Sequence, residues 1–265
     1  MHYIAVTHFQ FFRVGHFIAP QFQRRDNNLA MGECLMLVRA RFHRLLFSGL
    51  FALGLMAPVL ASAMTFELVP FGDSARCGQK CPLVIGATGE ITNESPREFY
   101  DFLYKNIGDP RVRSIVFIHS PGGAVEASMR LGTMFRQTGV MAIVGRVLPA
   151  PSGLGPALNV PGARCFSACV YALMGAKRRV VPADALVGIH RMHFDRSERD
   201  RVTDRFESNR TFGSSQFVAQ LANYANAMGV SRQLVYTAEK VDAERIHLLT
   251  SDELRKWRLG SRTYK

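Results

Sequence analysis

The chain has 265 residues, of which 48% are hydrophobic and 20% charged, a composition typical of a globular protein with room for a sizeable core. This composition argues against a disordered chain, a collagen-like repeat and a polytopic membrane protein. The net charge is +12, but residues 1–63 hold six Lys and Arg against two Asp and Glu, which leaves 27 basic and 19 acidic residues, a net +8, for the rest. Those charges are scattered, so we expect a solvated basic surface and no nucleic-acid partner.

The first 63 residues have the pattern of a secretion signal. Arginines precede an apolar run at 45–61, which ends in Ala61-Ser62-Ala63, the small-x-small form of a signal-peptidase site. We interpret 1–63 as an over-extended start followed by a signal peptide, and 64–265 as one folded domain. The alternative is a membrane anchor at 45–63, close to the length of a bilayer span. Either interpretation predicts a periplasmic, secreted or membrane-anchored domain outside the cytoplasm.

The number and spacing of the cysteines are consistent with an exported protein. Apart from Cys34, they form two pairs with a spacing of four, Cys77 with Cys81 and Cys165 with Cys169. An even number of cysteines suits disulfides in an oxidising compartment, and local pairing is the simplest of three connectivities. A four-thiolate zinc site is the weaker alternative, because a zinc knuckle usually has two residues between its cysteines and here there are three.

Apolar runs alternate with amphipathic segments along the rest of the chain. Ser95 and Glu98 predict a capping box at a helix start, with Phe99, Phe102 and Ile107 on its apolar face. The alternation predicts an α/β protein with a mostly parallel sheet in a single domain. We expect strands at 83–87, 114–119, 141–144, 179–181 and 186–190; helices at 95–107, 124–138, 167–175 and 206–228, with two short ones after Ser231 and Thr250; a loop at 146–164; and a charged connection at 195–205.

The first candidate site is Ser120-Pro121-Gly122-Gly123, between a buried strand and a helix. Two adjacent glycines let the backbone approach a ligand closely, and free N–H groups at a helix start bind developing negative charge. The alternative is a tight turn with no ligand. A phosphate-binding loop is excluded, because the chain contains no G-x-x-x-x-G-K-[ST] motif.

The second candidate is Ser167, at the start of a short helix between two cysteines. Its hydroxyl would lie near the positive end of that helix, with the amide of Ala168 as a donor to an oxyanion. The alternative is a helix-capping serine, which is the commoner role of serine at this position.

The third candidate is His190, at the end of a strand and 23 residues beyond Ser167. A neutral imidazole there would accept the serine proton as a general base. The alternatives are a structural histidine at a strand end, His193 as the base, and a Ser/Lys dyad with Lys177, although Lys177 lies in what we interpret as an exposed turn.

Taken in order, these pieces resemble the proteolytic subunit family of Clp proteases, within the crotonase-like superfamily. The resemblance spans about residues 83–259 and implies a ββα superhelix in one domain. The matching pieces are Thr88-Gly89-Glu90-Ile91, Ile118-His119-Ser120-Pro121-Gly122-Gly123, Gly162 with Ser167-Ala168, Gly175-Ala176-Lys177, Val187-Gly188-Ile189-His190 and Leu249-Thr250-Ser251-Asp252-Glu253-Leu254.

Carried over by position, the resemblance implies Ser167 as nucleophile and His190 as general base. The backbone amides of Gly123 and Ala168 would form the oxyanion hole. The implied reaction is peptide-bond hydrolysis through an acyl-enzyme, with no metal and no organic cofactor.

The sequence departs from the family pattern at three places. The aspartate that orients the histidine is replaced by Ile246, with Asp242 and Glu244 nearby, so the third member is unknown. The loop 146–164 is longer than the family's connection and would be able to roof the cleft. The cysteines on either side of Ser167 have no counterpart in the family.

The resemblance also bears on partners. Cytosolic family members form rings fed by ATP-driven unfoldases, but an exported enzyme has no evident ATP supply. We therefore expect a homo-oligomer without an unfoldase, acting on peptides or unfolded segments. The main alternative is a catalytically degenerate binding or scaffold protein. A crotonase-type acyl-CoA enzyme is disfavoured, because it needs no serine nucleophile and uses a cytosolic coenzyme.

Overall fold

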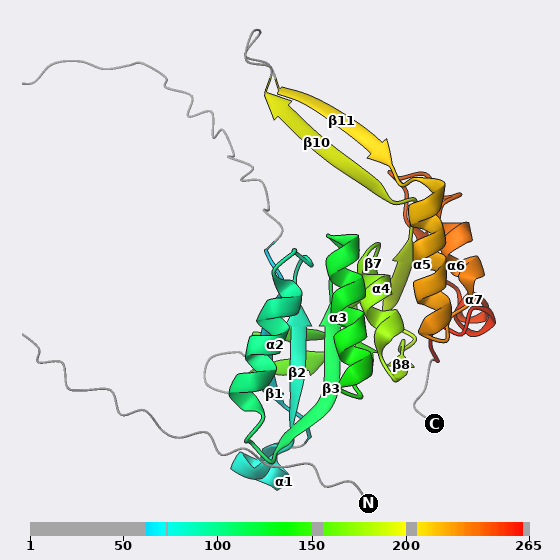
Figure 1. Ribbon diagram of the computed structural model, residues 1–265. Coiled ribbons are helices and arrows are strands. Elements are labelled where there is room, and N and C mark those ends of the chain that lie inside the picture. Colours follow the sequence, from blue (N-terminus) through cyan, green and yellow to red (C-terminus); the bar gives the residue numbers. More distant parts are fainter. Residues whose placement is uncertain (1–61, 73, 150–155, 200–205, 262–265) are drawn as a thin grey trace, which may run out of the picture. The chain divides into compact units, whose positions relative to one another are not determined.

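The computed structural model describes residues 62–72, 74–149, 156–199 and 206–261. The predicted signal segment therefore lies outside the described residues, apart from Ser62 and Ala63. A single domain contains a central five-stranded sheet (Figure 1). The order across this sheet is β1 (Thr65–Pro70), β2 (Leu83–Thr88), β3 (Val112–His119), β4 (Met141–Val144) and β8 (Arg178–Val180).

Strands β2, β3, β4 and β8 of this sheet run parallel to one another, and β1 pairs antiparallel with β2 at the edge. A second sheet has the order β12-β9-β7, with β7 (Arg164–Phe166) parallel to β9 (Leu186–Ile189) and β12 (His247–Leu248) antiparallel to it. The predicted mostly parallel α/β fold is confirmed. The antiparallel edge strand β1 was not predicted from the sequence.

The helices pack beside and between these sheets. Figure 1 shows α2 and α3 in front of the central sheet, and α5, α6 and α7 gathered near the carboxyl end of the described chain. Their bounds are α1 (Ser74–Cys77), the 3₁₀ turn η1 (Gly78–Lys80), α2 (Ser95–Asn106), α3 (Val125–Gln137), α4 (Cys169–Gly175), α5 (Ser215–Ala227), α6 (Arg232–Ala238) and α7 (Ser251–Lys256).

The core lies between the central sheet and these helices. Phe99 of α2 and Phe135 of α3 are fully buried and meet edge to face, with ring centroids 5.1 Å apart. The predicted apolar face is wrong at Ile107, which is 85% exposed because α2 ends one residue earlier. The predicted capping box is also wrong: Glu94 is the N-cap, and the Ser95 hydroxyl instead accepts a hydrogen bond from the amide of Thr92 (3.0 Å).

Helices α3 and α4 approach until their backbones touch. A Cβ atom on Gly175 of α4 would lie 1.9 Å from the carbonyl oxygen of Gly132 on α3, so no side chain fits there. A Cβ atom on Gly132 would lie 2.1 Å from the Tyr224 hydroxyl, which donates a hydrogen bond to the carbonyl of Tyr171 in α4 (2.9 Å). Two glycines therefore fix the spacing of these helices.

The expected loop 146–164 contains a hairpin of β5 (Arg146–Leu148) and β6 (Ala157–Asn159), which corrects the prediction of a simple loop. Val147 and Leu158 pack against the small cluster that includes Phe117. Phe117 and its neighbours on β3 point to opposite faces of the sheet, because side chains alternate along a strand. The hairpin thus covers the face opposite to α2 and α3.

Residues 195–199 of the expected charged connection and the first residues of the expected helix at 206–228 form two paired strands, so both predictions are wrong in part, and residues 200–205 lie outside the described ranges. Strand β10 (His193–Arg199) pairs with β11 (Phe206–Phe212), and opposite charges at Asp195 and Arg210 face each other across it. Cross-strand pairs of opposite charge stabilise such ribbons. The helix starts only after Ser214, whose hydroxyl accepts from the amide of Phe217 (3.2 Å).

The predicted caps of the last two helices are confirmed. The Ser231 hydroxyl accepts from the amide of Gln233 at the start of α6 (3.3 Å). Thr250 and Glu253 form a reciprocal capping box at the start of α7. Within the described ranges, no helix combines the length and hydrophobicity that a bilayer crossing needs.

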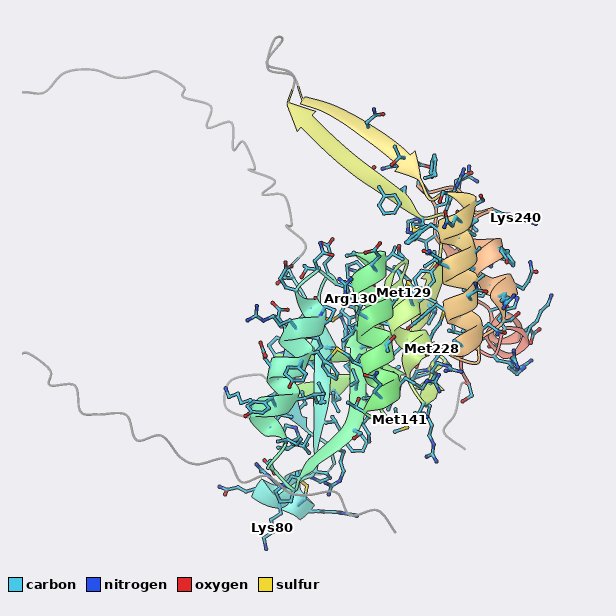
Figure 2. All side chains as sticks on the ribbon, in the orientation of Figure 1. Lys80, Met129, Arg130, Met141, Met228 and Lys240 are labelled. Atoms are coloured by element: carbon cyan, nitrogen blue, oxygen red, sulfur yellow. A yellow bond between two sulfur atoms is a disulfide. The ribbon has the colours of Figure 1, made fainter. Side chains whose placement is uncertain are left out.

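Two partly buried arginines connect the ends of several helices. The Arg136 guanidinium donates to the carbonyl of Met228 (2.8 Å), a residue labelled at the lower end of α5 in Figure 2. Burial and the positive charge of Arg136 lower the pKa of Arg179 to about 10. Arg179 donates hydrogen bonds to the carbonyls of Met174, Ala176, Met228, Arg258 and Leu259.

Candidate active site

Ser167 occupies an unusual backbone conformation between β7 and α4. Its φ is +54°, and among the described residues only Arg258 shares a positive φ without being glycine. Such a conformation costs a serine about 1–3 kcal/mol and persists only where the surroundings fix it. The Ser167 amide donates to the carbonyl of Gly188 (2.9 Å), and the Ser167 carbonyl accepts from the amide of Val170 (3.0 Å).

The Ser167 side chain does not cap the helix. Ala168 is the N-cap of α4, and no side chain bonds to the helix start. The hydroxyl makes no hydrogen bond to any described residue, His190 included. The capping alternative is therefore not what the structure shows.

The glycine turn after β3 packs directly against Ser167. Gly122 and Gly123 have φ values of +118° and +128°, a region that side chains rarely allow. A Cβ atom on Gly122 would lie 2.8 Å from the Cβ of Ser167, and one on Gly123 would lie 2.2 Å from the carbonyl oxygen of Ile91. Close approach of two backbones explains both glycines.

Backbone hydrogen bonds of Ser120 connect this turn to β7. The fully buried Ser120 donates its amide to the carbonyl of Arg164 (2.9 Å), and its own carbonyl accepts from the amide of Phe166 (3.1 Å). The Ser120 hydroxyl accepts from the amide of Gly122 (3.1 Å). The glycine turn and the Ser167 turn therefore form one hydrogen-bonded unit.

The amides of Gly123 and Ala168 donate no hydrogen bond to any part of the chain that the structure describes. The nitrogen of Ala168 lies 3.2 Å from where a Cβ of Gly122 would stand, so the turn that contains Gly122 and Gly123 packs against the start of α4. Paired, unbonded amides stabilise a developing anion without reorganisation.

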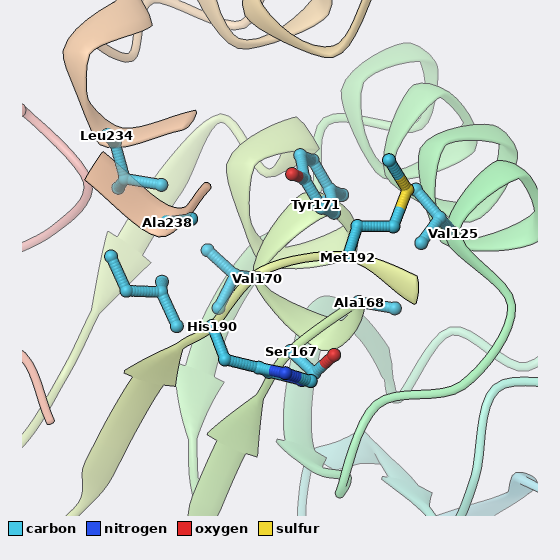
Figure 3. Close-up of a pocket in the computed structure, with 10 residues that line it drawn as sticks. Val125, Ser167, Ala168, Val170, Tyr171, His190, Met192, Leu234 and Ala238 are labelled. Atoms are coloured by element: carbon cyan, nitrogen blue, oxygen red, sulfur yellow. The ribbon is translucent and has the colours of Figure 1, made fainter. Parts of the chain in front are cut away.

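His190 follows β9 and lines the same pocket as Ser167. Figure 3 shows the ring and the serine hydroxyl at one end of this pocket, with Tyr171 and Met192 at the other. The remaining lining is apolar and comes from Val125, Ala168, Val170, Ile189, Leu234 and Ala238. Nothing in the sequence pattern had singled out Met192 or Tyr171, because their place follows from tertiary packing.

The surroundings favour a neutral imidazole at position 190. Burial lowers the pKa of His190 below its ordinary 6.5, and the nearby His193 and Arg210 lower it further. The backbone oxygen of Ala243 and the carboxylate of Glu244 act in the opposite direction but do not outweigh burial. A neutral imidazole is the form that can accept a proton.

No acid orients His190 among the residues that the structure describes. Its Nδ1 is buried and makes no hydrogen bond of acceptable geometry. Ile246 packs over Gly188, since a Cβ there would lie 2.3 Å from the Cγ2 of Ile246. Asp242 is 3.5 Å from the guanidinium of Arg245, and Glu244 pairs with Arg210.

The other proposed bases lie outside the pocket lining. Nε2 of His193 is 3.4 Å from a carboxylate oxygen of Asp195, and its ring centroid is 5.6 Å from that of His190. Lys177 is exposed, as expected for a turn residue. Ser167 and His190 are thus the serine and histidine that the fold brings to one pocket.

The two cysteine pairs form disulfides with the local connectivity, Cys77–Cys81 and Cys165–Cys169. The cysteines are therefore not zinc ligands. Across the described ranges, no three side chains of His, Cys, Asp or Glu are grouped to hold a metal ion.

A scan against protein-family models finds no match, and neither does a search of curated proteins. Among solved structures, the chain is similar to 1510-N, a membrane-bound stomatin-specific protease, at 16% identity and a TM-score of 0.44 over 67% of this chain and 78% of that one. It is also similar to the 1510-N membrane protease from Pyrococcus horikoshii that is specific for a stomatin homolog, at 17% identity and a TM-score of 0.39 over 67% and 70% of the two chains.

A further similar structure is ClpP1 from Listeria monocytogenes, at 15% identity and a TM-score of 0.37 over 66% of this chain and 85% of that one. The structures found include a Clp protease, the family that the sequence resembles. Because the identities and TM-scores are low, a function has to rest on the residues of this chain.

Proposed function

We propose that this protein is a serine-type peptidase with Ser167 as nucleophile and His190 as general base. The observation that carries the proposal is the conformation of Ser167: a serine at positive φ, with an unbonded hydroxyl, in one pocket with a histidine whose pKa is lowered. Strained backbone is concentrated at active sites and ligand clamps, so a serine at positive φ that lines a pocket points to function.

In this reaction, His190 takes the proton of the Ser167 hydroxyl as Oγ attacks the carbonyl carbon of a peptide bond. The resulting oxyanion accepts hydrogen bonds from the amides of Gly123 and Ala168. His190 then gives the proton to the leaving amine, and a water molecule hydrolyses the acyl-enzyme by the same steps in reverse order.

The missing acid sets an expectation for the rate. In a complete triad, the acid fixes the tautomer and orientation of the imidazole, and its loss lowers kcat by about 10⁴-fold. In this protein the backbone oxygen of Ala243 is the neutral group that approaches the ring. We therefore infer a slow peptidase.

The substrate class and the setting follow from the same proposal. Peptides or unfolded segments are the substrates that a peptidase can cleave without an ATP-driven unfoldase. We propose an exported protein that acts as a homo-oligomer, in the periplasm, secreted or anchored through residues 45–63. The two disulfides support an oxidising compartment.

A fluorophosphonate probe tests the proposal on the purified protein, since such probes label activated serines. We expect covalent labelling of Ser167, located by mass spectrometry, and no labelling of Ser167→Ala. A known serine hydrolase treated in parallel is the positive control. An unlabelled protein beside a labelled control would refute the proposal.

One observation favours a second candidate, a binding or scaffold protein that uses the same pocket. Nδ1 of His190 lacks a partner, and both nearby acids pair with arginines. This alternative predicts that Ser167→Ala leaves the cellular role intact in a complementation assay, whereas the peptidase proposal predicts its loss.

The pH dependence of the labelling rate is a separate prediction. Because burial and neighbouring positive groups hold the pKa of His190 below 6.5, the base stays neutral, and the rate stays high, until the pH falls through that lowered value. The acidic limb should therefore have its midpoint below pH 6.5.

The variant Arg210→Gln should move this limb to higher pH, because it removes a positive charge and releases Glu244, and both changes raise the pKa of His190. Arg232→Gln, at an exposed position on α6, is the matched control and should leave the limb in place. A wild-type midpoint above 6.5, or no displacement in Arg210→Gln, would contradict the assignment of His190.

Gly122→Ala tests the packing of the glycine turn on the nucleophile. The new methyl would meet the Cβ of Ser167 at 2.8 Å, so we expect the labelling rate to fall by about 10²-fold, the usual effect of a displacement of about 1 Å. Gly139→Ala is the matched control, with a positive φ of +72° but open space around it. Equal labelling rates in the two variants would be evidence against the contact's importance.

A further inference from the structure

The disulfide between Cys165 and Cys169 spans the turn that carries Ser167. Cys165 lies in β7 and Cys169 begins α4, so the serine stands midway between them. Both cysteines are fully buried, and their Cα atoms are 5.3 Å apart. A covalent bridge therefore closes this turn on the side away from solvent.

The two arms of the turn are held very differently without the bridge. On the strand side, hydrogen bonds to Ser120 and Gly188 fix Phe166 and Ser167 to neighbouring strands. On the helix side, Ala168 has an unbonded amide, and α4 begins without a side-chain cap. Helix α4 is also held by its close packing against α3, and the bridge adds a covalent link next to Ser167 that opposes relaxation of its backbone towards negative φ.

We propose that the Cys165–Cys169 disulfide is a positioning device for Ser167 and for the amide of Ala168. It ties the first residue of α4 to β7, and so restricts rotation of the backbone at Ser167, which keeps the hydroxyl in the pocket that His190 also lines. This inference rests on the proposed peptidase function, and it makes the two cysteines positioning residues that touch no substrate.

The chain contains a matched control for this proposal. Cys77–Cys81 closes a loop with the same sequence separation of four, so it restricts the unfolded chain to a similar extent. It joins α1 to the residue after η1, and none of these residues lines the pocket. The loop-closure effect on the unfolded chain should be comparable for the two bridges, although Cys165→Ala/Cys169→Ala also removes buried side-chain atoms, whereas effects on Ser167 should differ.

The experiment compares Cys165→Ala/Cys169→Ala with Cys77→Ala/Cys81→Ala, each in the full chain. We expect the rate of fluorophosphonate labelling, and kcat for peptide hydrolysis, to fall by about 10²-fold in the first variant and less than about twofold in the second. KM should change little in both variants. Hydrogen exchange of the amides at 166–170 should become faster only in the first variant.

The outcomes separate this inference from the proposed function. Equal labelling in both variants, or an equal loss in both, overturns the positioning role. If the wild-type protein is not labelled at all, the proposed function fails, and hydrogen exchange still decides whether the bridge fixes the turn: unchanged exchange at 166–170 overturns the inference.

If Cys165→Ala/Cys169→Ala does not fold, reduction provides a second test. In Cys77→Ala/Cys81→Ala, dithiothreitol reaches the buried bridge when the turn opens transiently; it then supplies two electrons and leaves two thiols, while the reductant becomes a cyclic disulfide. Labelling should fall in proportion to the thiols released and recover on reoxidation. Full labelling of the reduced, folded protein would overturn the proposal.

Discussion

Ser167→Ala is expected to lower kcat for peptide hydrolysis by about 10²-fold without changing the fold, because it removes the one group that attacks the substrate and the missing acid has already removed the rest of the triad's contribution. Ser167 is partly exposed and its hydroxyl has no partner, so its loss leaves no buried polar group unsatisfied. Initial rates on a fluorogenic peptide, with KM determined separately, measure the effect.

Ser231→Ala is the matched control for this variant. It removes a serine that caps α6, which should cost about 1 kcal/mol of stability and leave kcat unchanged. Two residues that act as a unit are non-additive, so Ser167→Ala/His190→Ala should be no slower than Ser167→Ala alone. Hydrolysis that survives in Ser167→Ala, or an additional loss in the double variant, would count against the pair.

Arg179→Met is expected to have the largest effect on stability, about 3–5 kcal/mol. Its guanidinium donates to five carbonyls, and its loss removes this donor from three that Arg136 does not also reach, those of Ala176, Arg258 and Leu259. A buried carbonyl left without a donor costs about 1–3 kcal/mol. Arg179→Lys should recover only part of the loss, because an ammonium cannot reproduce the planar fork.

Urea unfolding and thermal melting measure this prediction. A loss of 3–5 kcal/mol corresponds to a decrease in Tm of roughly 6–20 °C for a domain of this size. Arg232→Met, at an exposed position on α6, is the control and should change Tm by less than about 2 °C. Similar melting temperatures for the two variants would show that the hydrogen bonds from Arg179 to these carbonyls are not important for stability.

Some elements were predictable from sequence because one physical signal dominates each of them. The continuous apolar run of β3 and the periodic pattern of α3 gave bounds within two residues of those observed. The hairpin of β10 and β11 lacks such a signal. Its strands pair only with each other within the described fold, and their polar sequence does not alternate clearly enough to predict a strand.

The candidate site divides in the same way. Ser167, His190 and the glycine turn stand at strand ends, where residue type and order predict them. The residues behind His190 could not be predicted in this way. Segment 241–248 lies beside β9 because the amide of Arg191 donates to the carbonyl of Val241 (3.0 Å) and because β12 pairs with β9. Both contacts join residues far apart in the sequence, so the approach of Ala243 to His190 could not be predicted from a local pattern.

The contact between Gly132 and Gly175 has a consequence for how the pocket can change. Helix α3 begins just after Gly123 and α4 just after Ala168, so the spacing of the two proposed anion donors is governed by a crossing that lies far along both helices. A methyl group added at that crossing would push both helix starts apart at once. Adaptation to new substrates would therefore have to come from the side chains that line the pocket, while the distance between the two donor amides stays constant.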